Sequence, residues 1–260
     1  MKKTLVLAAA LILLVPALTF ADQIQFRLGF FLPRAVTSSY LAQHPDGLWT
    51  IELDQMTFLP RNYNSGILGF GYDYFVNKYV SLALSIDTYN RSQVGAYRDW
   101  VSNTLEEGDF AFPFDLYFGN NIVHSFKVSI TPLQASLKFL PLGRKTRVVP
   151  YVGGGASMIF WSVRMFGDMV DFADPFIYTD PEIGDVDVYP VVPVASHDSG
   201  TSFGWHAFGG FQVPIGYRAT IDAEARYHGR AQAKLGGLFE GFEPFDLGGW
   251  QFSLGLSYWF

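Results

Sequence analysis

The amino-acid sequence predicts an all-β protein, an eight-stranded antiparallel up-and-down transmembrane β-barrel. Three observations lead to this prediction. The final segment, 250–260, alternates large apolar side chains with small or polar ones, which is the pattern of a β-strand with one apolar face. The composition is 17% aromatic and 16% charged, with 26 Gly. Short and long connections alternate between the predicted strands, as in barrels that cross a membrane.

The N-terminus predicts a secretory signal peptide over residues 1–21. Lys2 and Lys3 precede an apolar run from Leu5 to Leu18, and Ala21 supplies a small residue for cleavage. The run is too short for a membrane-spanning helix. We expect residues 22–260 to form one outer-membrane β-barrel domain. The chain contains no Cys, so disulfides and thiolate chemistry are excluded.

The first three strands follow from strict alternation. Residues 23–32 alternate Ile, Phe and Leu with Gln, Arg and Gly, and residues 67–76 alternate Leu, Phe and Tyr with Gly and Asp. Residues 80–87 follow after a two-residue turn and alternate aliphatic side chains with Ser, Ala and Asp. Each segment therefore predicts a strand with one face toward lipid.

The fourth strand, 125–140, has a break in its pattern. Its apolar residues lie at even positions up to Ile130 and at odd positions from Leu133 onward. Because Pro132 cannot donate to a strand ladder, we expect a β-bulge at Thr131-Pro132 to absorb the change.

Four further strands complete the count. The fifth, 148–163, is Gly-rich, and we expect Val152, Ala156, Met158 and Phe160 to face outward. The sixth and seventh, 203–213 and 218–228, alternate apolar residues with polar or charged ones. The eighth is the terminal segment, whose length of about 10 residues suits a tilted transmembrane strand.

The connections predict how the barrel is oriented. Those at 77–78, 141–147 and 214–217 are short, whereas 33–66, 91–124, 164–202 and 229–249 are long. Bacterial outer-membrane barrels have short periplasmic turns and long external loops, so both chain ends are expected in the periplasm. A soluble up-and-down barrel would need apolar residues inside, and the last two segments show the reverse.

The pattern resembles the small eight-stranded bacterial outer-membrane β-barrel family, which includes the OmpA membrane domain and OmpW-like porin-family proteins. The segments that carry the resemblance are 131–133 with 139–141, 150–155, 224–227, and 246–250 followed by 255–260. It implies the outer membrane of a Gram-negative bacterium, contact with outer-membrane lipid and lipopolysaccharide, and a monomer. It also implies that the barrel-assembly machinery reads the terminal strand through Trp250, Phe252, Leu254, Leu256, Tyr258 and Phe260.

Charged residues on the inward parity predict a network inside the barrel. They are Arg27, Asp73, Asp87, Lys138, Asp222, Glu224 and Arg226. An eight-stranded barrel is just wide enough for side chains to fill, and buried charges must be paired. We interpret the set as a salt-bridge plug in which Arg27 approaches Glu224. A narrow polar pathway, or acid–base chemistry by Asp222 and Glu224, are the alternatives.

Nothing in the sequence predicts catalytic residues, a metal site or a cofactor. The His-x-Ser pattern of outer-membrane lipid A deacylases occurs once, as His197-Asp198-Ser199, in a predicted loop, and the five His residues are scattered. The net charge of −6 gives no reason to expect nucleic acid. We therefore predict a structural or surface-interaction role. The alternative is a narrow porin-like channel or carrier for small hydrophobic solutes, and a lipid-modifying enzyme is least favoured.

The long loops carry acidic and aromatic residues. The segment Asp180–Asp187 could hold Ca²⁺ or bridge lipopolysaccharide through divalent ions, although a solvated acidic loop is the simpler interpretation. The loop aromatics predict an ordered cap, contact with lipopolysaccharide or an apolar portal. They are Phe110, Phe112, Phe114, Tyr117, Phe118, Phe166, Phe172, Phe176, Tyr178, Phe239, Phe242 and Phe245.

Overall fold

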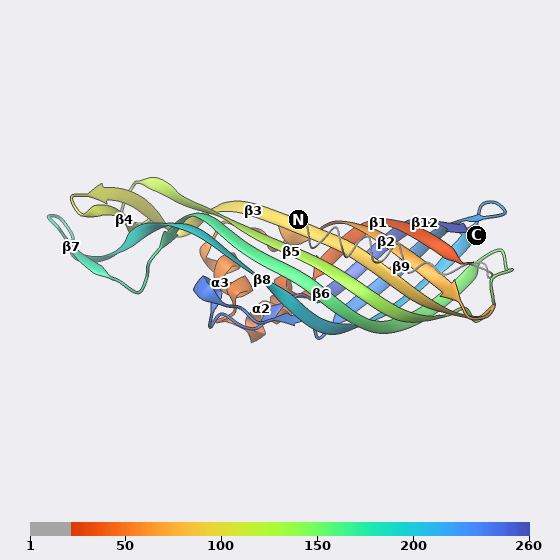
Figure 1. Cartoon of the computed structure of the whole chain (residues 1–260). Helices are drawn as coiled ribbons and strands as arrows, with labels where there is room; N and C mark the ends of the chain where they lie inside the picture. Colours follow the sequence, from red (N-terminus) through yellow and green to blue (C-terminus); the bar gives the residue numbers. More distant parts are fainter. Residues whose placement is uncertain (1–21) are drawn as a thin grey trace.

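The computed structural model describes residues 22–260, so the predicted signal peptide at 1–21 lies outside the described residues. Eight antiparallel strands form a closed barrel, as predicted (Figure 1). Each pairs with the next, and β12 pairs with β1 to close the ring. The strands are β1 (Gln23–Pro33), β2 (Ser65–Phe75), β3 (Val80–Leu105), β5 (Asn120–Phe139), β6 (Val149–Val170), β8 (Gly184–Pro214), β9 (Ala219–Gly229) and β12 (Gly249–Trp259).

Shorter elements lie in the connections. They are η1 (Arg34–Val36), α2 (Ser38–Gln43), α3 (Leu48–Gln55), η2 (Pro60–Tyr63), β4 (Gly108–Pro113), β7 (Phe176–Asp180), β10 (Gln232–Ala233), η3 (Gly237–Phe239) and β11 (Phe245–Asp246). Within residues 22–260 the helices are short, and none has the length and apolarity needed to cross a membrane.

The barrel strands differ greatly in length. β1, β2, β9 and β12 have 11 residues each, close to the roughly 10 that cross a bilayer. β3, β5, β6 and β8 have 26, 20, 22 and 31 residues. The prediction of long loops over 91–124 and 164–202 is therefore wrong for most of both segments. Their alternation continues, with polar residues replacing apolar ones outside, so the strands continue too.

Beyond the ends of the four short strands, only β3, β5, β6 and β8 continue. These four strands form an open half of the barrel wall, which we call the half-wall. β4 pairs with both β3 and β8 near its end, which joins the two edges of this half-wall again. We call residues 99–119 and 168–190 the arm. Figure 1 shows it projecting from the barrel on the side away from the short turns.

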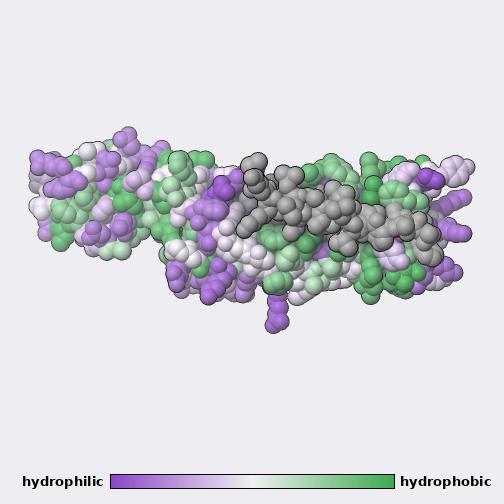
Figure 2. All heavy atoms as spheres, in the orientation of Figure 1, coloured by the Kyte–Doolittle hydropathy of each residue, from purple (hydrophilic) through white to green (hydrophobic). Residues whose placement is uncertain are grey.

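The outer surface of the barrel is an apolar band. Along β1, Phe26, Leu28 and Phe30 are about half exposed, and the outward residues of the other strands are similar. Tyr227 contacts both Trp205 and Trp250 near the ends of the short strands. Figure 2 shows hydrophobic side chains along this part and hydrophilic ones at both ends of the molecule. An exposed apolar band with aromatics at its edge is the surface of a transmembrane β-barrel.

The predicted bulge at Thr131-Pro132 is wrong. Pairing of β5 with β6 runs without a shift from His124 to Phe139. Even-numbered residues of β5 face inward throughout, and Ile130 and Lys138 are both buried. The apolar parity changes because the surroundings change. In the apolar band lipid lies outside and polar groups lie inside, whereas further along the outer face is polar and the inner face is apolar.

An apolar plug fills the half-wall above the short strands. We call residues 34–64 and 230–248 the plug. Trp49 of α3 is fully buried, stacks on Phe245 at 5.3 Å and meets Tyr63 and Phe126 edge-on. Backbone bonds from the plug also cover the free edge of β3, where Thr57 donates to the Ala96 carbonyl. The hydrophobic effect stabilises this packing, because the buried aromatic side chains remove large apolar areas from water.

Two outward positions on β5 test the change of surroundings. Leu137→Arg should lower the free energy of unfolding by about 2–4 kcal/mol, because a charge on the lipid face is costly near the midplane. Ser129→Arg, on the same face eight residues away, should change it by less than about 0.5 kcal/mol because that position faces water. Denaturant unfolding of the refolded barrel in liposomes measures both. Equal losses would contradict the assignment.

Candidate functional site: the closed lumen and the arm

The centre of the lumen is an ion pair that crosses a strand. Arg27 on β1, Gly69 on β2 and Asp87 on β3 stand in register. The Arg27 guanidinium reaches past β2 and donates to both Asp87 carboxylate oxygens at 3.1 and 3.2 Å. A Cβ at Gly69 would lie 1.9 Å from Asp87 Oδ1. The missing side chain at position 69 is therefore what lets the two charges meet.

Glu224 gathers the second half of the network. It accepts from Arg27 Nη1 at 3.3 Å and from Arg226 Nε at 2.9 Å through Oε1. Its other oxygen accepts from the Tyr151 hydroxyl at 3.1 Å. The carboxylate thus lies between two guanidiniums and a phenol, all buried, and charge-assisted bonds of this kind are the strong ones.

The remaining interior charges pair separately. Lys138 donates to Asp73 at 2.8 Å and lies over the Tyr151 ring at 4.0 Å. Asp222 accepts from the Ser257 hydroxyl, and the ion pairs of the described chain do not include it. The structure therefore places all seven predicted residues inside the barrel. Four of them share one network, Lys138 and Asp73 form a separate pair, and Asp222 bonds to a hydroxyl.

Neutral polar side chains complete the lumen, and the sequence reasoning did not single them out. Gln134 donates to Asp87 at 3.1 Å and accepts from Ser85 at 3.0 Å. The His206 ring lies between the hydroxyls of Ser136 and Ser157, 2.7 Å from each. In the sequence these residues can be recognised as polar residues at inward positions of the strands, which is the same pattern that identified the interior charged residues.

The plug closes the lumen a second time, above the charge network and on the side of the arm. Glu52 of α3 lies 2.8 Å from Nε2 of His124 on β5, and both side chains are buried. Arg98 donates to the carbonyls of Leu53 and Met56 at the end of the same helix, at 3.1 and 2.6 Å. Burial raises the pKa of Tyr63, which lies in the plug. Its hydroxyl therefore stays neutral.

A small space lies where the plug and the charge network meet. A cavity of about 20 Å³ lies there, lined by Asp87, His228 and Gln251 together with apolar residues. That is room for about one water molecule. The inward side chains at the charge network and those of the plug core are buried, so they occupy the barrel interior at both levels.

The histidines are spread over the plug, β5, β8 and β9 in the described chain, and one of them, His124, faces a carboxylate. Among residues 22–260, no three His, Cys, Asp or Glu side chains lie close enough to hold a metal ion. His228 is 3.0 Å from Gln251, and His44 stacks on Tyr40 at 4.2 Å. The segment His197-Asp198-Ser199 lies in β8 and not in a loop as expected, and Asp198 accepts from the backbone N–H of Gly236 in the plug at 2.7 Å.

The arm is uniformly acidic. Its two ranges contain twelve Asp and Glu residues and no Lys, Arg or His, out of 24 acidic residues in the chain. The ion pairs of the described chain lie in the lumen and plug, not here. Backbone N–H donation from Glu182 holds the pKa of Asp180 below its usual value. The twelve are Asp99, Glu106, Glu107, Asp109, Asp115, Asp168, Asp171, Asp174, Asp180, Glu182, Asp185 and Asp187.

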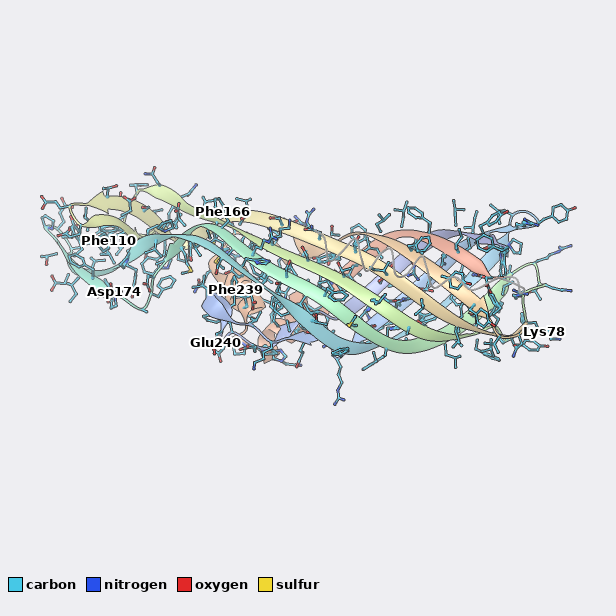
Figure 3. All side chains as sticks on the ribbon, in the orientation of Figure 1. Lys78, Phe110, Phe166, Asp174, Phe239 and Glu240 are labelled. Carbon is cyan, nitrogen blue, oxygen red and sulfur yellow. The ribbon has the colours of Figure 1, made fainter. Side chains whose placement is uncertain are left out.

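The arm has its own apolar core. Phe112 lies between Tyr117 and Tyr178, with ring centroids 4.9 and 5.3 Å away, and Phe110 and Val188 are buried beside it. Figure 3 shows Phe110 and Asp174 at the end of the molecule opposite Lys78, with Phe239 at the plug. The arm is therefore a packed extension of the sheet.

The loop aromatics divide between these cores and the surface. Phe239 and Phe245 are buried in the plug and Phe110 and Phe112 in the arm, in agreement with an ordered cap. Several apolar side chains of the arm remain exposed. They are Phe114, Leu116, Phe118, Phe172, Phe176, Ile177 and Ile183.

No protein-family model and no curated protein matches the sequence. Solved structures of small outer-membrane β-barrels are similar in fold. The N-terminal barrel domain of Pseudomonas aeruginosa OprF is 11% identical over 92% of this chain and 97% of that one, with a TM-score of 0.39. Ail, the attachment invasion locus protein of Yersinia pestis, is 12% identical over 92% and 98%, with a TM-score of 0.42. Neisserial surface protein A is 12% identical over 93% and 99%, with a TM-score of 0.42.

Gly69→Ala tests the gap that Arg27 and Asp87 share. The new methyl group would displace the Asp87 carboxylate, so the free energy of unfolding should fall by about 1–3 kcal/mol. Gly71→Ala is the matched control on the same face of β2, because its Cβ would meet nothing closer than 3.5 Å. Denaturant midpoints of the two refolded variants give the comparison. Equal midpoints would mean that the pair does not depend on the glycine.

Glu224→Gln tests whether the charge network stabilises a closed barrel or gates a pathway through it. The substitution leaves Arg27 and Arg226 to share Asp87, so stability should fall by about 3–5 kcal/mol. Conductance in a planar bilayer should stay at background, because the apolar plug closes the barrel independently. Glu182→Gln, an exposed carboxylate of the arm, is the control and should change neither quantity. A rise in conductance with unchanged stability would show instead that the network is a gate.

Proposed function

We propose that this protein is a closed outer-membrane β-barrel of a Gram-negative cell envelope, and that it presents the arm outside the cell for surface interaction. The observation that carries the proposal is the contrast between the two parts. The lumen holds a network of ion pairs and is covered by the apolar plug. The arm exposes apolar side chains and carboxylates that form no ion pair within the described residues. A filled barrel supports interaction at its surface better than passage through it.

The proposed orientation rests on the short turns. They lie at the same end as Gln23 and Trp259, the ends of the paired β1 and β12, and short turns face the periplasm in bacterial barrels. The arm would then face outward, beyond lipopolysaccharide. The apolar band is the surface expected to contact outer-membrane lipid.

The terminal strand supports a further part of the proposal. On β12, Trp250, Phe252, Leu254, Leu256 and Tyr258 face outward and are exposed. Phe260 follows the strand, and its backbone N–H donates to the Asp22 carbonyl. We infer that the barrel-assembly machinery reads this segment, and that the closed barrel works as a monomer.

The Cys-free sequence makes the orientation directly testable. Glu182→Cys places a thiol at the exposed tip of the arm, and Lys145→Cys places one in a short turn. A membrane-impermeant maleimide should label the first variant on intact cells and the second only after the outer membrane is permeabilised. Wild-type protein, without Cys, supplies the blank. Labelling of Lys145→Cys alone on intact cells would overturn the proposal.

A further inference from the structure

The β7–β8 hairpin of the arm has two different faces. Tyr178 and Val188 face the arm's core. Across the hairpin Ile177 pairs with Asp187 and Thr179 with Asp185, so these four side chains share the opposite face. Ile177 is 62% exposed and Ile183, in the turn, is 53% exposed. Apolar and acidic groups therefore alternate over one water-facing surface.

The charge on this surface limits what can cover it. Twelve carboxylates without one cationic side chain repel a second arm and repel phosphate-bearing lipid headgroups. Simple ion binding is not favoured either, because the described residues form no cluster able to hold a metal ion. Ile177 and Ile183 are exposed, however, and a partner that covered them would gain binding free energy from the hydrophobic effect.

We propose that this face of the arm docks a cationic polypeptide segment that carries apolar side chains among its Lys and Arg residues. This inference rests on the proposed function, since it needs the arm outside the cell. Lys and Arg would meet Glu182, Asp185 and Asp187, and apolar side chains would cover Ile177 and Ile183. Because the carboxylates stand on a sheet with its own buried core, they are held in place before binding, which lowers the ordering cost.

A synthetic peptide of alternating Lys and Leu residues is the probe, with a Glu and Leu peptide of equal length as its counterpart. Fluorescence anisotropy with full-length protein in lipid nanodiscs should show binding of the Lys peptide alone. The affinity should fall as salt rises, because exposed charge pairs are screened.

Two triple variants locate the binding face. Glu182→Gln, Asp185→Asn and Asp187→Asn together should weaken binding of the Lys peptide about tenfold, because each substitution removes one exposed charge pair. Asp46→Asn, Asp54→Asn and Glu240→Gln remove the same charge from the exposed surface of the plug and should leave the affinity unchanged. Ile177→Thr should weaken binding even in high salt. Equal loss in both triple variants would mean that net charge alone attracts the peptide, and would overturn the proposal.

Other occupants give distinguishable results. Binding of Ca²⁺ without the peptide, or an arm-dependent dimer in sedimentation, would overturn a polypeptide partner. If Glu182→Cys is labelled on intact cells and the Lys peptide still does not bind, this inference fails while the proposed function stands. If Glu182→Cys is not labelled, both fail.

Discussion

The structure depends on one constraint: strand parity is fixed, while the medium outside the strands changes from lipid to water. Side chains alternate along β5 without interruption, so the same inward parity must serve two environments. Where the outer face meets lipid, the inward positions receive the polar residues, among them Gln134 and Lys138. Where the outer face meets water, the inward positions receive Phe126, Val128 and Ile130. An all-polar interior above the membrane would leave no hydrophobic core to hold the extended strands.

This inversion explains why the barrel has two closures of different chemistry. In the membrane part, six of the seven interior charged residues form ion pairs, which fits the high cost of an uncompensated buried charge. Arg27, Glu224 and Arg226 pair by sharing partners from β1, β3 and β9. Above it, an open half-wall would expose apolar surface and free strand edges. The plug covers both, and its Trp49 contacts residues from the plug and the wall.

Sequence reasoning succeeds where the period-two pattern has one cause. The eight strands and the inward charges follow from parity, because lipid imposes an apolar outer face on every strand. The pattern break at Thr131-Pro132 comes from the change of medium and not from the predicted bulge, although both give the same signal in one strand. The sequence does not predict the arm strands, because their outer residues are polar, which is also typical of loops. The partners within the network could not be predicted in full, because they depend on which strands face one another across the barrel and on a glycine such as Gly69.

The arm's own apolar core, which is separate from the core of the plug, also matters for the role proposed for the arm. A surface loop without a core would lose conformational entropy when a partner orders it. The arm avoids much of that cost, because Phe112 and Val188 pack inside it and β4 ties β3 to β8. Its carboxylates repel one another, and the arm's own core holds them together on one packed extension of the sheet. A surface that keeps like charges close in this way favours a partner of opposite charge, since such a partner relieves the repulsion as it binds. The plug and the charge network below need not move for this, which fits the proposal that the barrel stays closed while its arm binds a partner.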